Sequence, residues 1–383
     1  MDYEISIIGG GPAGSTAAVQ LARCGFSVAL FERKSFPREV LCGEFLSIEV
    51  TKILKELKLF NNFIKLNPNP VNSMSFYFDD EKMLNKQLNF QAYAVKRSVF
   101  DNFLLNSAKD AGVNVYQPSA VNNVTRHDNN FVLNITNENG DVKKIYSKHV
   151  IAAYGKSGFL DKRLKRNFAG KKTYLNGIKF HIDNKFLCKH RVNEISLFVS
   201  KGIYCGINSV NGNESTVCFL ENKKKYLNSS KDHLIDLFFN GYKISNPFKD
   251  IFKDKIKSQH VYGTGNIYFG KRKVVENGIY MIGDAAGIIA PLSGDGIGMA
   301  MESAMLLSKI LVNLKKNKIS KQKADKLYSN EWEKMFRSRM FLALMIQNFI
   351  MSGKINNVGY AALKKFPYLT NYLLKNTRNF KIR

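Results

Sequence analysis

The stretch DYEISIIGGGPAGSTAAVQLARCGFSVALFER, residues 2–33, decides the fold of this chain. Residues 5–8 form a short apolar run of the kind found in buried parallel strands, and apolar residues at 17, 18, 21 and 22 then repeat at helical spacing. Gly25 ends the helical pattern, and residues 27–32 form a second mainly apolar run. We therefore expect a strand, a turn, a helix and a second strand.

Three glycines in the turn, Gly9, Gly11 and Gly14, follow the spacing G-x-G-x-x-G. The first permits a tight turn, the second lets a pyrophosphate approach the backbone, and the third lets the helix pack on the strand. Pro12 and Ala13 complete the turn, and the positive end of the following helix faces the phosphates. The spacing predicts a dinucleotide site.

The second strand ends at Glu32, 21 residues after Gly11. This is the position at which a carboxylate accepts a hydrogen bond from the ribose 2′-hydroxyl of a dinucleotide. Arg33 follows directly, and we count it with the cofactor-binding residues.

A second glycine-rich segment lies far along the chain, in GIYMIGDAAGIIAPLSGDGIGMAMESA at residues 278–304. It again predicts a strand, a turn at Gly283-Asp284, and a helix that starts near Gly296, Ile297 and Gly298. The backbone N–H groups of such a helix start stabilise negative charge.

Together the two segments resemble the FAD-binding fold of the aromatic-hydroxylase and geranylgeranyl-reductase superfamily. The resemblance implies FAD as the cofactor, with Asp284 bonded to the ribityl chain and the backbone of residues 296–298 facing the N1–C2=O edge of the flavin. It implies an α/β fold with a Rossmann-like FAD-binding domain of the aromatic-hydroxylase type, an inserted antiparallel β-sheet domain for substrate, and a helical C-terminus.

A third segment matches the R-x-x-F-D helix start of this superfamily with Arg97, Phe100 and Asp101, and the resemblance places the arginine beside FAD. The sequence departs from the hydroxylases at Tyr154-Gly155, where those enzymes carry an Asp-Gly pair that serves both FAD and NAD(P)H. A tyrosine cannot supply that carboxylate, so use of NAD(P)H in the hydroxylase manner is in doubt.

The domain pattern is discontinuous. Short, roughly alternating runs separated by Asn and Gly turns follow residue 173 and predict an antiparallel sheet. We expect the FAD-binding domain to comprise residues 1–67, 96–172 and 271–335, the sheet domain 68–95 and 173–270, and a helical C-terminal extension 336–383.

The segment FPREVLCGEFLS, residues 36–47, follows the second strand and can reach the flavin ring. Its Cys42-Gly43 pair resembles a cysteine-glycine signature of geranylgeranyl reductases. Cys42 and Glu44 are therefore candidate catalytic groups, since a thiol or carboxyl group there could give a proton to a substrate carbanion. The alternatives are that Cys42 packs against substrate, flavin or core, and that Glu44 is an acid at the start of the next helix.

Two reactions remain open. The first is reduction of C=C bonds in a lipophilic isoprenoid or polyene-like substrate, with electrons from NAD(P)H or ferredoxin. The second is monooxygenation of an aromatic or polyketide substrate. The segment GDGIG at 294–298 resembles the corresponding segment of the reductases. Of the aromatic motif of those enzymes, this sequence keeps only the tyrosine, Tyr204. The single tryptophan, Trp332, lies outside the region of the halogenase signature.

The composition excludes several other classes. The net charge of +27 comes from basic residues spread from Lys34 to Arg383, without the clustered helix of a nucleic-acid-binding module, so we expect no nucleic-acid partner. The five cysteines form no C-x-x-C pair, and we expect no metal site. Their odd number and the lack of a secretory leader favour a reducing cytoplasm.

The tail segment EKMFRSRMFLALMIQNFIMS, residues 333–352, is helical in pattern and basic. It could pack against the FAD-binding domain, or it could cover a lipophilic substrate and contact an anionic membrane surface. The first alternative is the ordinary one for an amphipathic helix.

Overall fold

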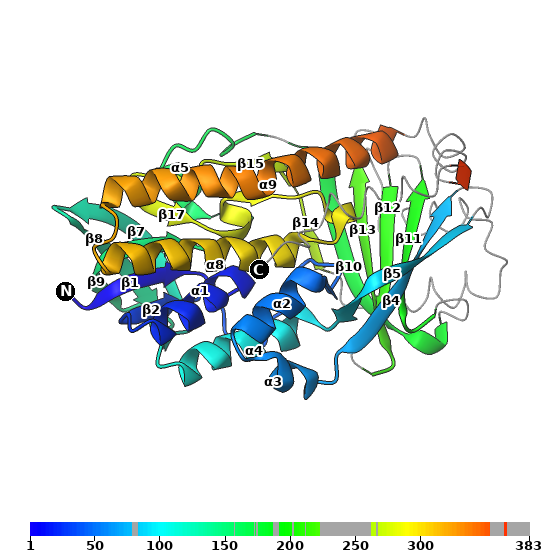
Figure 1. The fold of residues 1–383 in the computed structure, drawn as a ribbon, viewed down its shortest axis with the longest axis horizontal. Helices are drawn as coiled ribbons and strands as arrows, with labels where there is room; N and C mark the ends of the chain where they lie inside the picture. Colours follow the sequence, from blue (N-terminus) through cyan, green and yellow to red (C-terminus); the bar gives the residue numbers. More distant parts are fainter. Residues whose placement is uncertain are drawn as a thin grey trace.

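The computed structural model describes residues 1–78, 83–156, 158–171, 173, 175–186, 191–200, 203–210, 212–222, 262–265, 267–352, 364 and 365. In this part of the chain two large β-sheets lie toward opposite ends of the molecule, with long helices running beside the first (Figure 1). Residues 223–261 and most of 353–383, which were assigned above to the sheet domain and to the tail, lie outside the described residues.

The first sheet is of the nucleotide-binding type that the glycine turn predicts. Its parallel part has the order β17-β9-β1-β2-β6, formed by β1 (Tyr3–Ile8), β2 (Val28–Phe31), β6 (Asn114–Tyr116), β9 (Val142–Ala152) and β17 (Ile279–Met281). Antiparallel neighbours are β16 (Val275–Glu276), β7 (Ser119–His127) and β8 (Asn130–Asn137). At its centre the fully buried Ile7 pairs with Leu30 on one side and Ile151 on the other.

The described helices are α1 (Pro12–Arg23), α2 (Ile48–Glu56), α3 (Phe60–Ile64), α4 (Arg97–Asp110), α5 (Phe159–Arg163), α8 (Gly296–Lys315) and α9 (Lys321–Ser352). Of these, α1, α4, α5 and α9 contact strands of the first sheet, whereas α2 packs against α3 and α8. Helix α1 begins and ends where the opening stretch predicts, and it packs against α4 and α8 through its buried alanines. The α/β fold class inferred from the sequence is confirmed.

By length and composition, α8 is long and apolar enough to cross a membrane, and among the described residues it is the one helix that meets this test. However, 67% of its apolar window is buried inside the protein. It contacts α1, α2 and α9. Helix α8 is therefore a core helix of this fold.

The second sheet has the order β14-β10-β13-β12-β11-β4-β5-β3. Its strands are β3 (Phe45–Leu46), β4 (Asn69–Phe78), β5 (Met83–Ala94), β10 (Leu175–Asp183), β11 (Glu194–Ser200), β12 (Ile203–Ser209), β13 (Glu214–Asn222) and β14 (Tyr262–Thr264). The expectation of a purely antiparallel sheet is wrong at one place, because β4 and β11 pair in parallel. No turn joins these two strands, which lie more than a hundred residues apart, so no hairpin imposes the antiparallel direction.

Helix α9 packs against the body of the protein, which is the first of the two alternatives for the tail. Tyr328, Trp332 and Phe336 are fully buried, and the far end of the helix reaches β11 and β12 (Figure 1). The domain boundary expected between residues 335 and 336 falls inside this continuous helix. The helix therefore joins the two sheets rather than starting a separate extension.

Candidate active site

The glycine turn after β1 has no room for a side chain at Gly9 or Gly14. A Cβ on Gly14 would lie 1.9 Å from the carbonyl oxygen of Gly9, and a Cβ on Gly9 would lie 2.4 Å from the carbonyl oxygen of Ala153. Gly9 also has φ of +108°, which residues with a side chain rarely adopt. The glycines therefore bring the start of α1 against the ends of β1 and β9.

The start of α1 opens onto a cavity of about 980 Å³ that extends to the second sheet. Gly11 is the N-cap residue and no side chain caps the helix. A Cβ on Gly11 would meet nothing closer than the Arg38 guanidinium, at 3.7 Å. Open space at an uncapped helix start fits the pyrophosphate of FAD.

The two glycine-rich segments meet at this cavity. A Cβ on Gly283 would lie 2.9 Å from Cβ of Ala13, so the turn after β17 directly contacts the start of α1. Both strands run parallel to β9, and their carboxyl ends therefore lie at one edge of the sheet. Asp284 faces the cavity from this turn, where it could hold the ribityl chain.

Eleven of the thirteen residues assigned above to cofactor binding line the cavity, and so do both candidate catalytic residues. They are Gly9, Gly11, Pro12, Ala13, Glu32, Arg33, Arg97, Gly283, Asp284, Gly296 and Ile297, together with Cys42 and Glu44. The other two, Gly14 and Gly298, serve packing instead, and a Cβ on Gly298 would lie 2.6 Å from Oδ1 of Asp295 and 3.0 Å from Oγ of Ser47.

Glu32 is buried at the end of β2 and holds the glycine turn as well as facing the cavity. Its Oε2 accepts the N–H of Gly10 at 2.8 Å, and its Oε1 accepts the N–H of Lys34 at 3.0 Å. Each carboxylate oxygen has a second lone pair, so a ribose hydroxyl can still bind. Arg38 lies 3.7 Å from this carboxylate and beside Gly11. Arg38 was not singled out from the sequence, although it lies within FPREV, and its guanidinium could bind a phosphate at Gly11.

Arg97 begins α4, as the R-x-x-F-D pattern predicts. Its guanidinium binds both carboxylate oxygens of Asp101, at 2.7 and 2.8 Å. Its backbone N–H donates to Oε1 of Glu44 at 2.8 Å, and its charge interacts with the Cys42 thiol. Arg97 therefore contacts the candidate catalytic loop directly.

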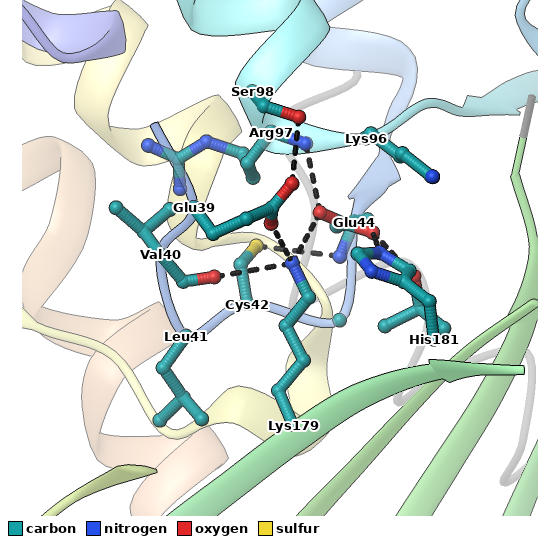
Figure 2. Close-up of polar contacts among 12 residues, drawn as sticks. Glu39, Val40, Leu41, Cys42, Glu44, Lys96, Arg97, Ser98, Lys179 and His181 are labelled. Atoms are coloured by element: carbon teal, nitrogen blue, oxygen red, sulfur yellow. Dashed lines mark hydrogen bonds and ion pairs between the residues drawn. The ribbon is translucent and has the colours of Figure 1, made fainter. Parts of the chain in front are cut away.

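Glu44 lies at the centre of a buried polar network (Figure 2). Its Oε1 binds Nζ of Lys179 at 2.5 Å and accepts the N–H of Arg97 at 2.8 Å. Its Oε2 contacts Nε2 of His181 at 2.7 Å and accepts the hydroxyl of Thr216. These contacts tie the 36–47 loop to β10 and β13 of the second sheet.

The network keeps Glu44 ionised. Burial alone would raise the pKa of the Glu44 carboxyl, but the hydrogen bond from His181 and the charge of Lys179 lower this pKa to about 2. A group with so low a pKa does not hold a proton at neutral pH, so the environment does not suit the proton-donor role considered for Glu44. Glu44 is also not the first acid of α2, which begins at Ile48 after Ser47.

The same cluster has the geometry of a cation site. Ligand atoms of Glu39, Glu44 and His181 lie within 4.8 Å of one another. The ammonium of Lys179 already binds both carboxylates, at 2.7 Å from Glu39 and 2.5 Å from Glu44. An internal cation therefore takes the place that a metal would need.

Cys42 is half-buried on the cavity wall, and its sulfur accepts the N–H of Glu44 at 3.3 Å. Across the cavity the second sheet presents Tyr204, Gly206 and Cys218, which the sequence analysis did not assign to the site, except that Tyr204 was noted in an incomplete motif. Strand register brings them together, because Tyr204 pairs with Leu220 and Gly206 pairs with Cys218. That register could not be read from the sequence.

Tyr154 and Gly155 follow the end of β9 and line the cavity. The Tyr154 hydroxyl donates to Asp161 at 2.6 Å and accepts from Arg166 at 2.8 Å. Asp161 is buried and also accepts the N–H of Gly158 at 2.8 Å. Its carboxylate points into the protein, so it does not restore the Asp-Gly pattern of the hydroxylases.

Replacing Asp284 with alanine is expected to weaken FAD binding by about 1.5–3 kcal/mol, the usual loss for a hydrogen bond to a charged group. Titration of the apoprotein with FAD, followed by flavin fluorescence, measures this change. Asp110→Ala, which removes an exposed carboxylate at the end of α4, is the matched control and should bind FAD normally. Equal affinities of the two variants would remove Asp284 from the site.

The glycine turn after β1 and the turn after β17 meet at one edge of the sheet, beside the cavity. We call these two turns the glycine cradle. This arrangement is typical of a dinucleotide-dependent enzyme. Comparison with known proteins makes this specific. A family model described as an FAD binding domain matches residues 2–335, so the chain belongs to this family of FAD-binding proteins. It is an FAD-dependent oxidoreductase.

Curated relatives fall into more than one reaction class. The chain is 25% identical over 341 residues to the digeranylgeranylglycerophospholipid reductase of Methanocaldococcus jannaschii, covering 86% of this chain and 82% of that protein. It is also 25% identical over 350 residues to the 1H-pyrrole-2-carbonyl-[peptidyl-carrier protein] chlorinase of Pseudomonas fluorescens, covering 82% and 77%.

A solved structure has the same fold. A geranylgeranyl bacteriochlorophyll reductase-like protein of Thermoplasma acidophilum superposes with a TM-score of 0.71 at 18% identity, covering 97% of this chain and 98% of that one.

Proposed function

We propose that this protein reduces C=C bonds of a lipophilic, isoprenoid or polyene-like substrate. The observation that carries the proposal is the position of Cys42, a thiol on the wall of the cavity that also contains the cofactor cradle. A reductase of this kind needs a proton donor beside the flavin, and Glu44 is ionised and cannot serve.

The composition of the cavity wall supports a lipophilic substrate. Six side chains from the 36–47 loop, the second sheet and the segment before α8 form an apolar surface, namely Leu41, Tyr204, Leu220, Ile267, Phe269 and Ile288. Lys156 lies at its edge, 3.5 Å from the carbonyl oxygen of Leu41, and forms no ion pair in the described part of the chain. We propose that this ammonium pairs with an acidic group at one end of the substrate.

In this proposal FAD, when bound and reduced, would supply a hydride to one carbon of the double bond. The Cys42 thiol donates a proton to the other carbon, and the double bond becomes a single bond. The resulting thiolate lies beside the Arg97 guanidinium and regains its proton from solvent. NAD(P)H or ferredoxin would supply the two electrons for the next cycle.

Monooxygenation is the competing reaction, and halogenation is another, since a chlorinase is among the relatives. Asp161, the carboxylate nearest to Tyr154, is engaged inside the protein, which counts against use of NAD(P)H in the hydroxylase manner. Trp332 is buried within α9, outside the cavity lining, which counts against halogenation.

Incubation of the holoprotein with geranylgeranyl diphosphate or retinoic acid tests the proposal. Anaerobic reaction with dithionite as reductant should give a product heavier by two hydrogen atoms for each double bond reduced, measured by mass spectrometry. Products that form only in air and are heavier by one oxygen atom would instead support the monooxygenase alternative. Absence of any saturated product from either probe would count against this substrate class.

We also propose that the chain divides into the FAD-binding part and the substrate-binding sheet given above, and that the protein is cytoplasmic.

A contact with anionic membrane surfaces is proposed for the outer side of α9. There Phe341 is 65% and Met345 54% exposed, and the exposed Arg337 lies one turn before them.

A further inference from the structure

The residues that match the FAD-binding family end at 335, yet α9 continues beyond this point to Ser352. One turn past the matched region, Arg339 points inward and is 5% exposed. A guanidinium is rarely buried without a specific set of partners. Its partners show what this part of the helix does.

Arg339 binds carboxylates from three positions on two other helices. Its NH2 group donates to Oδ2 of Asp295, and its NH1 group donates to Oε2 of Glu302 at 2.7 Å. Glu49 of α2 lies 3.8 Å from the same guanidinium. All three acids are buried, and each of them forms an ion pair with Arg339.

This cluster lies directly behind the cofactor cavity. Asp295 is the N-cap residue of α8, and its neighbours Gly294 and Gly296 line the cavity while Asp295 does not. Gly298, in the first turn of α8, has no room for a side chain because Asp295 and Ser47 contact it closely. The position of the start of α8 is thus set by the acids that Arg339 holds.

The same stretch of α9 supports the segment that leads into α8. A Cβ on Gly287 would lie 3.0 Å from Cε of Met340 and 3.0 Å from the Trp332 ring. Helix α9 therefore contacts the cavity-lining segment on both sides of Pro291.

We propose that Arg339 is a positioning residue for the flavin, which holds the start of α8 in place and raises the reduction potential of bound FAD. Two-electron reduction leaves negative charge on the flavin ring. With FAD in the cavity, the backbone N–H groups at the start of α8 would stabilise that charge, whereas the carboxylates behind them would oppose it. Arg339 offsets those carboxylates and keeps the helix start at the cavity. This inference does not depend on which substrate is reduced or oxidised.

Arg339→Met should lower the midpoint potential of bound FAD. We expect about a tenfold loss of affinity for the reduced cofactor relative to the oxidised one, which corresponds to about 30 mV for a two-electron couple. Reductive titration of each holoprotein against a reference dye measures it, and FAD titration of the apoproteins measures occupancy. Arg337→Met is the matched control, because Arg337 lies two residues away and its side chain is 74% exposed.

Variants of Asp295 supply a test of sign. Asp295→Asn removes a negative charge behind α8 and should raise the midpoint potential. The double variant should return toward the wild-type value, since the two charges interact directly. Arg339→Lys keeps the positive charge, so the midpoint potential of its bound FAD should stay close to the wild-type value.

A purely structural role would lower the melting temperatures of these variants and leave the midpoint potentials of the folded holoproteins unchanged. Unchanged potentials in both Arg339→Met and Asp295→Asn would overturn the proposal. Shifts of the same sign in both variants would also overturn it, because opposite signs follow from the charges.

Discussion

Replacement of Cys42 by serine is expected to slow reduction of a double bond by about 10²–10⁴-fold, the range typical of lost general acid catalysis. A serine hydroxyl keeps nearly the size of the thiol but is a far weaker acid. FAD binding and reduction of FAD by dithionite should stay close to those of the unchanged protein, because Cys42 is outside the glycine cradle. Single-turnover measurements of substrate reduction separate these steps.

Cys24→Ser provides the control for this experiment, since Cys24 is an exposed thiol at the end of α1. It should turn over normally. If Cys42→Ser and Cys42→Ala also turn over normally, the thiol only packs in the 36–47 loop. The reductase proposal would then lose its main chemical support, while the assignment of FAD would stand.

The second large effect concerns stability. Lys179→Met should lower the free energy of unfolding by about 3–5 kcal/mol, because it leaves the buried carboxylate of Glu44 without its cation (Figure 2). Urea unfolding at neutral pH and a constant FAD concentration measures the loss. Lys271→Met, which breaks the exposed pair between Lys271 and Glu333, should cost at most about 1 kcal/mol.

The loss from Lys179→Met should also depend on pH in a definite direction. In the unchanged protein the pKa of Glu44 is lowered to about 2, so its stabilising contribution is complete above the unfolded-state pKa and is lost as the pH falls toward 2. Without Lys179 this folded-state pKa rises, and protonation relieves the unpaired charge. The difference between the two proteins should therefore shrink as the pH is lowered from about 7 to about 4.5. A constant difference would show that Lys179 acts through packing alone.

The nucleotide-binding part could be predicted because its signals are local. Gly9 and Gly14 are needed for close backbone contacts that any chain with this strand, turn and helix must make, and Gly11 leaves open space at the start of the helix. The turn at Asp284 was predicted for the same reason. In both segments the spacing of the glycines predicts the turn and the start of the following helix. The two turns lie together because β1 and β17 both run parallel to β9 in one sheet.

The position of the 36–47 loop at the cavity was predicted, but the residues that surround the loop were not. Cys42 lines the cavity as expected, whereas the partners of Glu44 come from strands about 135–170 residues further along the chain. Which side chains of β10 and β13 face the loop depends on strand register, and a shift of one residue would turn Lys179 and His181 away. A single sequence does not determine that register. For the same reason the parallel pairing of β4 with β11 was missed.

The cofactor cradle has a consequence for the biogenesis of the enzyme. Its first half, Gly9–Gly14, leaves the ribosome about 270 residues before the turn at Asp284 and the start of α8. At about 5–20 residues per second this interval lasts roughly 15–50 s, during which β1 also lacks β9 for much of the time. The nascent chain must therefore carry exposed apolar strands with no completed place for FAD. Availability of the cofactor can help this protein only after most of the polypeptide has been made, and the yield of folded enzyme depends on protection of its N-terminal strands until then.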